Sequence, residues 1–445
     1  MRPLISRILL VLCAVTMFVP VNLLAQSSID SRKIPLGQLK SVKPKTDKGS
    51  SAGFASAGIK KNGLQNKSFA ATKGLPGVDS LANWSDEFTA PGYDPNGNSE
   101  SVWQYTMVGT PPETGQTTAI QAPIVPMELD LLGPNGQVAS YKGHPLVFTS
   151  TPDIVGAVLN SPVFLPVKYN SGYGQFNDEM MRASFWNRTH RFGDDNWDNG
   201  WHTLLIPGLK KTRKMQIPYG SWYFFVDGND VPVAAAVEGG VFSSVFFPPT
   251  FPIDNSTPIG AAELAGDITT KTMATFLFNN VFLYDTTIDN CCVLGFHSYD
   301  YEPGVPGNGN RERRYVLNFS SWLSPGFFAF GFEDITPWSH ELAETFADPF
   351  VDNVTPWWLS VDPVLGYGQC QDILEVGDVI EVLTSNAVFP IALSGRTYHP
   401  QNETLMPWFE FQSPSKAYHG SYSFPDETTL LSLSPGPLLP GCQAP

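Results

Sequence analysis

The hydrophobic and polar positions along the chain predict a mixture of strands and helices from about residue 84 onward. Short apolar or alternating runs that end near Gly, Pro or Asn favour strands, which we predict at 123–131, 201–206, 221–226, 241–247, 281–284, 292–299 and 314–319. Apolar residues at helical spacing predict helices at 152–159, 175–186, 261–279 and 336–348. The segment 352–368 shows neither pattern, so we expect it to be irregular. The mixture indicates an α+β fold without internal repeats.

The helix predicted at 336–348 has signals at both ends. Thr336 is expected to be the N-cap, and Pro337 then falls at the first helical position, where its missing N–H costs nothing. Pro349 disfavours helical backbone at Asp348, so we expect the helix to end there. At about 100° per residue, four apolar residues gather on one side and predict the face that packs on the core: Ile335, Trp338, Leu342 and Phe346.

Another side of this helix gathers one imidazole and three carboxylates: His340, Glu341, Glu344 and Asp348. Residues four apart lie one above the other on a helix, so His340 and Glu344 can share a metal ion. The sequence His-Glu-x-x-Glu is thus a variant of the His-Glu-x-x-His motif of zinc hydrolases. The alternative is a solvated acidic helix face that includes a histidine by chance, and the pattern alone leaves this open.

The composition agrees with a large globular protein rather than a coiled coil. Of 445 residues, 42% are hydrophobic and only 16% are charged, while Gly and Pro contribute 39 each. The first 80 residues hold 12 of the 27 basic residues and 3 of the 42 acidic ones, so the rest carries a net charge of −24. This charge disfavours a nucleic-acid partner, because phosphate binding requires basic surfaces, and it favours bound cations.

The N-terminal residues predict export. Arg2 and Arg7 form a charged region before an apolar run at 8–19, and Ala25 is a candidate cleavage site, as in a secretory signal peptide. The predicted parts are a signal peptide (1–25), a basic linker or pro-segment (26–82), a folded domain with a possible subdivision near 255 (83–430) and an extended tail (431–445). No later run is apolar enough for a transmembrane segment, and we predict a secreted monomer.

Four cysteines follow the predicted signal peptide: Cys291, Cys292, Cys370 and Cys442. An even number in an exported chain is compatible with disulfide bonds. Because adjacent cysteines seldom bond each other, we expect Cys291 or Cys292 to pair with Cys370.

Several blocks of the sequence are similar to the exordium / phosphate-induced protein 1 family, which includes secreted plant proteins and bacterial relatives. The blocks are His340–Glu344 with Asp348–Val351 after it, Glu375–Asp378, and the histidine-bearing block Cys292–Tyr299. The resemblance covers roughly 276–381, and Ile380 stands where plant members tend to carry a cysteine. The family implies growth-related roles in the wall more than a defined reaction.

The helix of this family resembles the active-site helix of zincin metallopeptidases. This resemblance implies a zincin-like mixed sheet with a metal-site helix and a β-rich N-terminal part, in which one strand pairs with extended substrate. His340 and Glu344 would then be metal ligands, and Glu341 would be the general base that activates the bound water. The third ligand would be Glu375, with Asp378 either sharing the metal or orienting His340. A simple turn is the alternative for these last two acids.

Two further residues have two interpretations each. Asp348 either joins the metal cluster or accepts backbone N–H groups after the helix. His297, on the strand predicted at 292–299, is either a ligand or oxyanion donor near the helix, or a hydrogen-bonded core histidine. Zinc is the expected ion for one histidine with carboxylates, and Mn²⁺ or Ca²⁺ would compete more strongly than at a site with two histidines.

The predicted function is therefore a secreted metal-binding protein that hydrolyses peptide bonds of an extracellular polypeptide. The competing class is a non-catalytic extracellular signalling or cell-wall glycan-binding protein on the same scaffold. Trp357, Trp358 and Trp408 support that class if they are exposed, since tryptophans stack on sugar rings, whereas packing in the core is their more common role.

Overall fold

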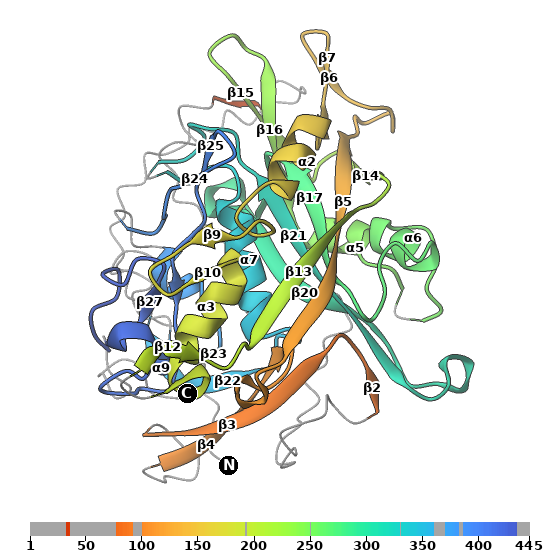
Figure 1. Cartoon of the computed structure of the whole chain (residues 1–445). Helices are drawn as coiled ribbons and strands as arrows, with labels where there is room; N and C mark the ends of the chain where they lie inside the picture. The colour runs from red at the N-terminus through yellow and green to blue at the C-terminus, as the bar shows by residue number, and fades with distance from the viewer. Residues whose placement is uncertain are drawn as a thin grey trace, which may run out of the picture.

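The computed structural model describes residues 33–35, 77–91, 100–191, 194–249, 251–329, 331–359, 370–381 and 386–433 (Figure 1). The predicted signal peptide, most of the basic segment 26–82 and most of the tail 431–445 lie outside the described residues. The fold is α+β, as predicted: a curved main sheet, a smaller second sheet and helices on both faces of the main sheet.

The described helices are mostly short. They are α2 (Pro152–Leu159), α3 (Phe176–Ser184), α4 (Trp186–Thr189), α5 (Gly239–Phe246), α6 (Pro258–Leu264), α7 (Thr336–Ala347), α8 (Asp378–Glu381) and α9 (Met406–Phe409). Even α7, with its 12 residues, falls short of a bilayer's thickness, and no helix in the described ranges qualifies as a membrane span.

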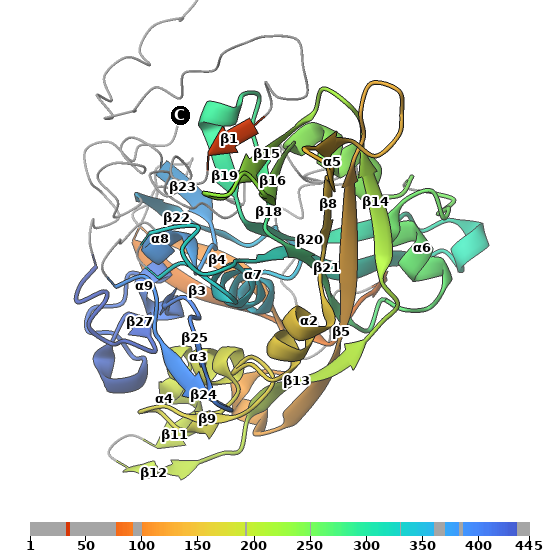
Figure 2. The same ribbon diagram turned by 90° about the horizontal axis from the view of Figure 1, so that it is seen from above.

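The main sheet is built on the long strand β5 (Thr117–Leu131), which is parallel to β13 (His202–Leu209) and to β17 (Met273–Asn279). β17 is parallel to β21 (Glu312–Trp322), whereas β20 (Gly295–Glu302) is antiparallel to β21. Three shorter strands join this sheet: β2 (Val78–Asp79), β8 (Val147–Thr149) and β14 (Arg213–Ile217). The sheet combines strands from before and after residue 255, and it curves around α7 (Figure 2).

The two faces of the main sheet carry different layers, because side chains alternate along each strand. On one face, Trp338 of α7 donates from Nε1 to Thr275 Oγ1 of β17 at 2.9 Å. On the other face, Phe276 of β17 packs edge-on against Phe246 of α5, with ring centroids 5.0 Å apart. The main sheet therefore separates α7 from α5 and α6, and each face has its own hydrophobic core.

Within the described ranges, the second sheet and seven two-stranded ribbons complete the fold. The second sheet holds β1 (Lys33–Pro35), β15 (Trp222–Val226), β16 (Pro232–Glu238), β18 (Val281–Tyr284) and β19 (Cys291–Val293). The ribbons are β3 (Asn83–Pro91) with β4 (Glu100–Val108), β6 (Ser140–Tyr141) with β7 (His144–Pro145), β9 (Val167–Lys168) with β10 (Tyr173–Gly174), β11 (His190–Arg191) with β12 (Asp194–Asp198), β22 (Val354–Leu359) with β23 (Cys370–Ile373), β24 (Ile391–Leu393) with β25 (Arg396–Tyr398), and β26 (Glu403–Thr404) with β27 (Ser423–Phe424). The C-terminal ribbons lie against α7 on the side away from β5 (Figure 2), so this helix is enclosed between the main sheet and later parts of the chain.

Two predicted elements are wrong, and burial explains both. The segment 241–247 belongs to helix α5 rather than to a strand: Glu238 caps the helix by accepting the Val241 N–H at 2.7 Å, and aromatic residues one turn apart face the sheet. The helix predicted at 261–279 ends at Leu264, and its second half is β17, which is buried on both faces and so lacks the alternation of a half-exposed strand. The irregular segment 352–368 also contains β22.

The helix predicted at 336–348 is confirmed within one residue at each end. Ile335, rather than Thr336, is the N-cap, and Pro337 occupies the second helical position. The Thr336 hydroxyl instead donates to Glu333 O at 2.8 Å and to His399 O at 2.5 Å, which fixes the start of α7 to a C-terminal loop.

The predicted disulfide is wrong. Cys291 and Cys292 bond each other at the start of β19, so neither pairs with Cys370. The prediction rested on the rarity of bonds between adjacent cysteines, and this pair is an exception.

Asp300, which is buried, and Glu263, which is half-buried, form an acid pair on the α6 face of the main sheet. Burial and the charges of Asp300 and Glu302 raise the pKa of Glu263 to about 10, and burial raises that of Asp300 to about 7. Both pKa values lie above those of the unfolded chain, which are near 4. Their contribution to stability is therefore complete below about pH 4 and is lost as the pH rises through 7 and then 10.

Glu263→Gln is expected to raise the melting temperature by several degrees at pH 8 and to leave it nearly unchanged at pH 5. At pH 8 the amide removes the acid whose ionisation beside Asp300 is unfavourable, whereas at pH 5 both carboxyl groups of the wild type are protonated. Thermal unfolding followed by circular dichroism at both pH values measures the difference. The same shift at pH 5 and pH 8 would show that the charge pair is not its cause.

Candidate metal centre

His297 reaches the centre from the main sheet. It lies on β20 opposite Asn318 of β21, and its neighbour Phe296 packs on the α5 face. Alternation then directs His297 to the other face, toward α7, where its side chain is about 1% exposed. The strand pattern therefore accounts for the direction of this histidine.

The polar side of α7 is enclosed rather than solvated. His340, Glu341 and Glu344 are each 0% exposed, so the alternative of an acidic surface face is wrong. The main sheet covers one side of the helix, and the segment 374–378 with the C-terminal ribbons covers the other. Buried carboxylates at this density require positive charge close by.

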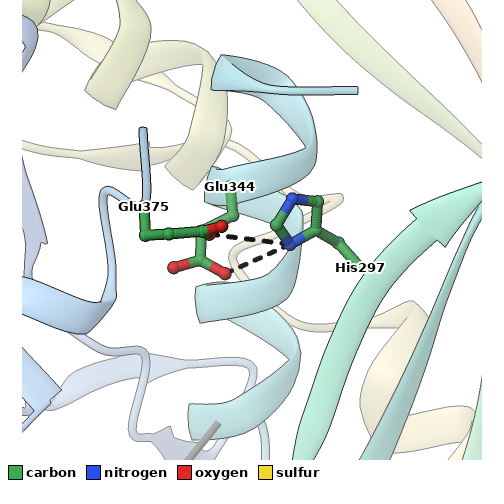
Figure 3. Close-up of side chains that lie close together, drawn as sticks. All are labelled: His297, Glu344 and Glu375. Carbon is green, nitrogen blue, oxygen red and sulfur yellow. Dashed lines mark ion pairs between the residues drawn. The ribbon is translucent and has the colours of Figure 1, made fainter. Parts of the chain in front are cut away.

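Three ligands from three segments converge in the first group of residues: His297, Glu344 and Glu375 (Figure 3). His297 Nδ1 lies 3.3 Å from Glu344 Oε2 and 3.9 Å from Glu375 Oε2, and one ligand atom from each of the three residues lies within 4.8 Å of the others. Glu341 Oε2 is 3.8 Å from the same imidazole nitrogen. One imidazole and two carboxylates at these separations can close around a single divalent cation.

Glu344 also belongs to a second group, with His340 and Glu341. Its Oε1 atom lies 3.0 Å from His340 Nε2 and accepts the Gly377 N–H at 3.2 Å. The two oxygens of Glu344 thus face two different imidazoles, Oε2 toward His297 and Oε1 toward His340. This carboxylate is the centre of the arrangement.

The imidazoles stabilise the charge of Glu344. Burial alone would raise its pKa, but the charges of His340 and His297, together with hydrogen bonding from His340, outweigh burial and bring the pKa to about 2. Burial likewise opposes protonation of His340, but the charge and hydrogen bond of Glu344 raise the pKa of this histidine above its ordinary value. The fold therefore favours an ionised carboxylate at position 344.

Gln401 holds His340 in place, and no sequence pattern pointed to this residue. Its side-chain amide nitrogen lies 2.7 Å from His340 Nδ1 and donates to Gly377 O at 2.8 Å. This contact orients the ring so that Nε2 faces Glu344. Gln401 lies 61 residues beyond His340, and no local pattern links the two.

The other predicted site residues have distinct places. Glu375 belongs to the first group, where its histidine neighbour is His297; the resemblance implied a set with His340, which lies in the second group instead. Asp378 begins α8 with Oδ1 3.7 Å from His340 Nε2, a position that fits the orienting role. Asp348 is not in either group: its oxygens accept N–H from Asp352 and Asn353, each at 3.1 Å, which is its alternative role.

A third cluster at the start of α7 was not predicted. His399 Nδ1 lies 2.8 Å from Asp334 Oδ2 and 3.2 Å from Glu333 Oε1. Asp334 Oδ1 also accepts the backbone N–H groups of Ile335 and His399. These contacts join a C-terminal loop to the start of α7.

No family model, no curated protein and no solved structure matches this chain. The resemblance to exordium proteins therefore stays a prediction that rests on the sequence blocks quoted above.

Gly377→Ala is expected to weaken metal binding by about 10- to 100-fold, the usual effect of disturbing residues that orient ligands. A Cβ atom at Gly377 would overlap the His340 ring, so the imidazole or the turn must move away from Glu344. Metal titration of the variant measures the loss. Gly156→Ala is the matched control, because a Cβ there meets no atom within 4 Å; equal affinities for the two variants would contradict the expectation.

Proposed function

We propose that the protein is a divalent-cation-dependent hydrolase, with the cation held by His297, Glu344 and Glu375 and with Glu341 as the general base. The observation that carries this proposal is the convergence of these three ligands, from β20, α7 and the turn before α8, at one buried point. The burial of these carboxylates also supports the proposal, because a bound cation would compensate charges whose burial alone is unfavourable.

The donor set fits zinc, with manganese or calcium as competitors, since two of its three ligands are carboxylates. A cation held by these residues would lower the pKa of a bound water and polarise a carbonyl oxygen. Glu341 lies next to this point and is placed to accept a proton from the attacking water. Gln401 and Gly377 hold the His340–Glu344 pair, and this keeps the shared carboxylate oriented.

An extended polypeptide is the proposed substrate. Among the described strands, β20 pairs only with β21, and β20 runs antiparallel to the rest of that part of the sheet beside α7. Such a strand offers backbone groups to which an extended peptide can add. The strand order and the metal helix agree with a zincin-like interpretation, and the predicted signal peptide favours an extracellular substrate.

The alternative is a non-catalytic extracellular protein in which the cation holds three elements together. The nearly complete burial of His297, Glu344 and Glu375 favours it, because a structural site needs no access for substrate. A glycan-binding form of this alternative loses support, because Trp358 and Trp408 are buried. Their rings pack edge-on against each other, with centroids 5.8 Å apart. The side chain of Trp357 lies outside the described set.

Elemental analysis and a protease assay on the same preparation test the proposal. We expect bound zinc, hydrolysis of an unstructured polypeptide such as casein, loss of hydrolysis on chelation, and recovery when Zn²⁺ is returned. His297→Ala should weaken zinc binding at least 100-fold, and His419→Ala, an exposed histidine paired with Glu427, should not. Metal without hydrolysis would support the structural alternative, and absence of any bound metal would overturn both.

A further inference from the structure

The third cluster, at the start of α7, is a further group of possible metal ligands, and it shares no residue with the candidate centre. It joins Glu333 and Asp334, just before the helix, to His399, which directly follows β25. His399 Nδ1 lies 2.8 Å from Asp334 Oδ2 and 3.2 Å from Glu333 Oε1, and one ligand atom from each residue lies within 4.8 Å of the others. None of these residues takes part in the proposed hydrolysis.

These separations fit a bound cation. Ligand atoms around a tetrahedral zinc ion, with metal–ligand bonds of about 2.0–2.1 Å, lie about 3.3 Å from one another. The two distances from His399 Nδ1 are close to that value, so a zinc ion requires only a small outward movement of the side chains. Because an imidazole accompanies the two carboxylates, the donor set suits zinc better than calcium or magnesium.

The backbone holds the aspartate and the imidazole at this spacing. Asp334 Oδ1 accepts the backbone N–H groups of Ile335 and His399, which leaves Oδ2 toward the imidazole. The backbone of Asp334 is itself paired with Leu323 through two hydrogen bonds, of 2.7 and 3.2 Å, and His399 O accepts the Thr336 hydroxyl. None of these contacts uses the ligand atoms, so a cation can bind without breaking them.

The third cluster is open to solvent, unlike the candidate centre. The side chains of Glu333, His399 and Asp334 are 22%, 17% and 6% exposed, so an ion can enter without opening the fold, and water can complete its coordination. Among the described residues, His399 is the only basic side chain within ion-pair distance of either acid. Two carboxylates with one imidazole stay negative even when the imidazole is protonated, and a divalent cation compensates both acids.

We propose that Glu333, Asp334 and His399 form a second zinc site at the surface, independent of the candidate centre. This inference goes beyond the proposed function and does not rest on it. The role of the site is structural, because its ligands join a C-terminal loop to the start of α7. Gln401, two residues after His399, contacts His340 Nδ1 at 2.7 Å. An ion that fixes His399 therefore also fixes the segment that positions His340.

Calorimetric titration of the metal-stripped full chain with Zn²⁺ tests the surface site. We expect two zinc ions per wild-type chain, and one in His297→Ala, which lacks a ligand of the candidate centre. His399→Ala and Glu333→Gln should each weaken the surface site by more than about 100-fold, because disturbing only the partners of a ligand already costs about 10- to 100-fold. His419→Ala is the matched control and should still bind two: His419 Nδ1 lies 3.0 Å from Glu427 Oε2, but this pair belongs to no three-ligand group among the described residues.

Circular dichroism of each variant confirms that the fold is intact before the titration. One zinc ion in the wild type that is lost in His297→Ala would overturn the surface site and leave the proposed function standing. One ion that is kept in His297→Ala and lost in His399→Ala would support the surface site and overturn the proposed function. Two ions in both His399→Ala and Glu333→Gln would also overturn the surface site, and a wild type that binds no zinc would overturn both proposals.

Discussion

Glu341→Gln is expected to lower kcat by about 10²- to 10⁴-fold while the metal content stays unchanged. The amide keeps the shape of the side chain but cannot take a proton from water. Shape matters here because the Glu341 side chain packs against the backbone of β20: a Cβ at Gly295 would lie 2.6 Å from its Cγ. Glutamine preserves that packing, so the loss reports on the proton transfer.

Steady-state kinetics and elemental analysis on the same samples provide the measurement. Glu375→Gln is the matched control, because the same chemical change at a proposed ligand should lower the metal content as well as the rate. A Glu341→Gln chain that loses its metal would show that Glu341 is a ligand in the second group, with His340 and Glu344. Full activity in the variant would exclude Glu341 as the base.

The sequence correctly predicts the helices whose ends are marked by capping residues and prolines. α2 is correct at both ends because Thr151 caps it and Pro152 occupies its first position. α7 is correct within one residue for similar reasons. The errors at α5 and β17 come from segments that are buried all round, where the apolar residues no longer mark one face and only the packing decides between helix and strand.

The candidate centre likewise contains some residues that local sequence patterns reveal and others that only the fold reveals. The spacing of His340, Glu341 and Glu344 on one helix is local, so the sequence shows it. The direction of His297 follows from strand alternation once β20 is known to lie beside α7. Gln401 reaches the site through long-range packing, because it comes from a loop that carries no pattern of its own. Residues of this kind cannot be identified from the sequence, because only the fold brings their distant segments to the site.

Glu344→Ala is expected to abolish metal binding at the candidate centre and to lower the free energy of unfolding of the metal-free protein by on the order of 3 kcal/mol. The pKa of Glu344, at about 2, lies below its ordinary value, so its folded surroundings stabilise its charge despite complete burial. Its removal leaves the Gly377 N–H, the Nε2 atom of His340 and the Nδ1 atom of His297 without their carboxylate.

Denaturant unfolding in the presence of a chelator separates this cost from the stability that metal binding adds. Glu344→Gln is the matched variant: its amide oxygen can still accept from Gly377, so it should lose the metal but less of the stability. The difference between the two variants then measures the hydrogen bond, and the difference between glutamine and wild type measures the charge. A metal-free Glu344→Ala protein as stable as the wild type would mean that the imidazoles do not depend on this carboxylate, and Glu344 would not be the centre of the site.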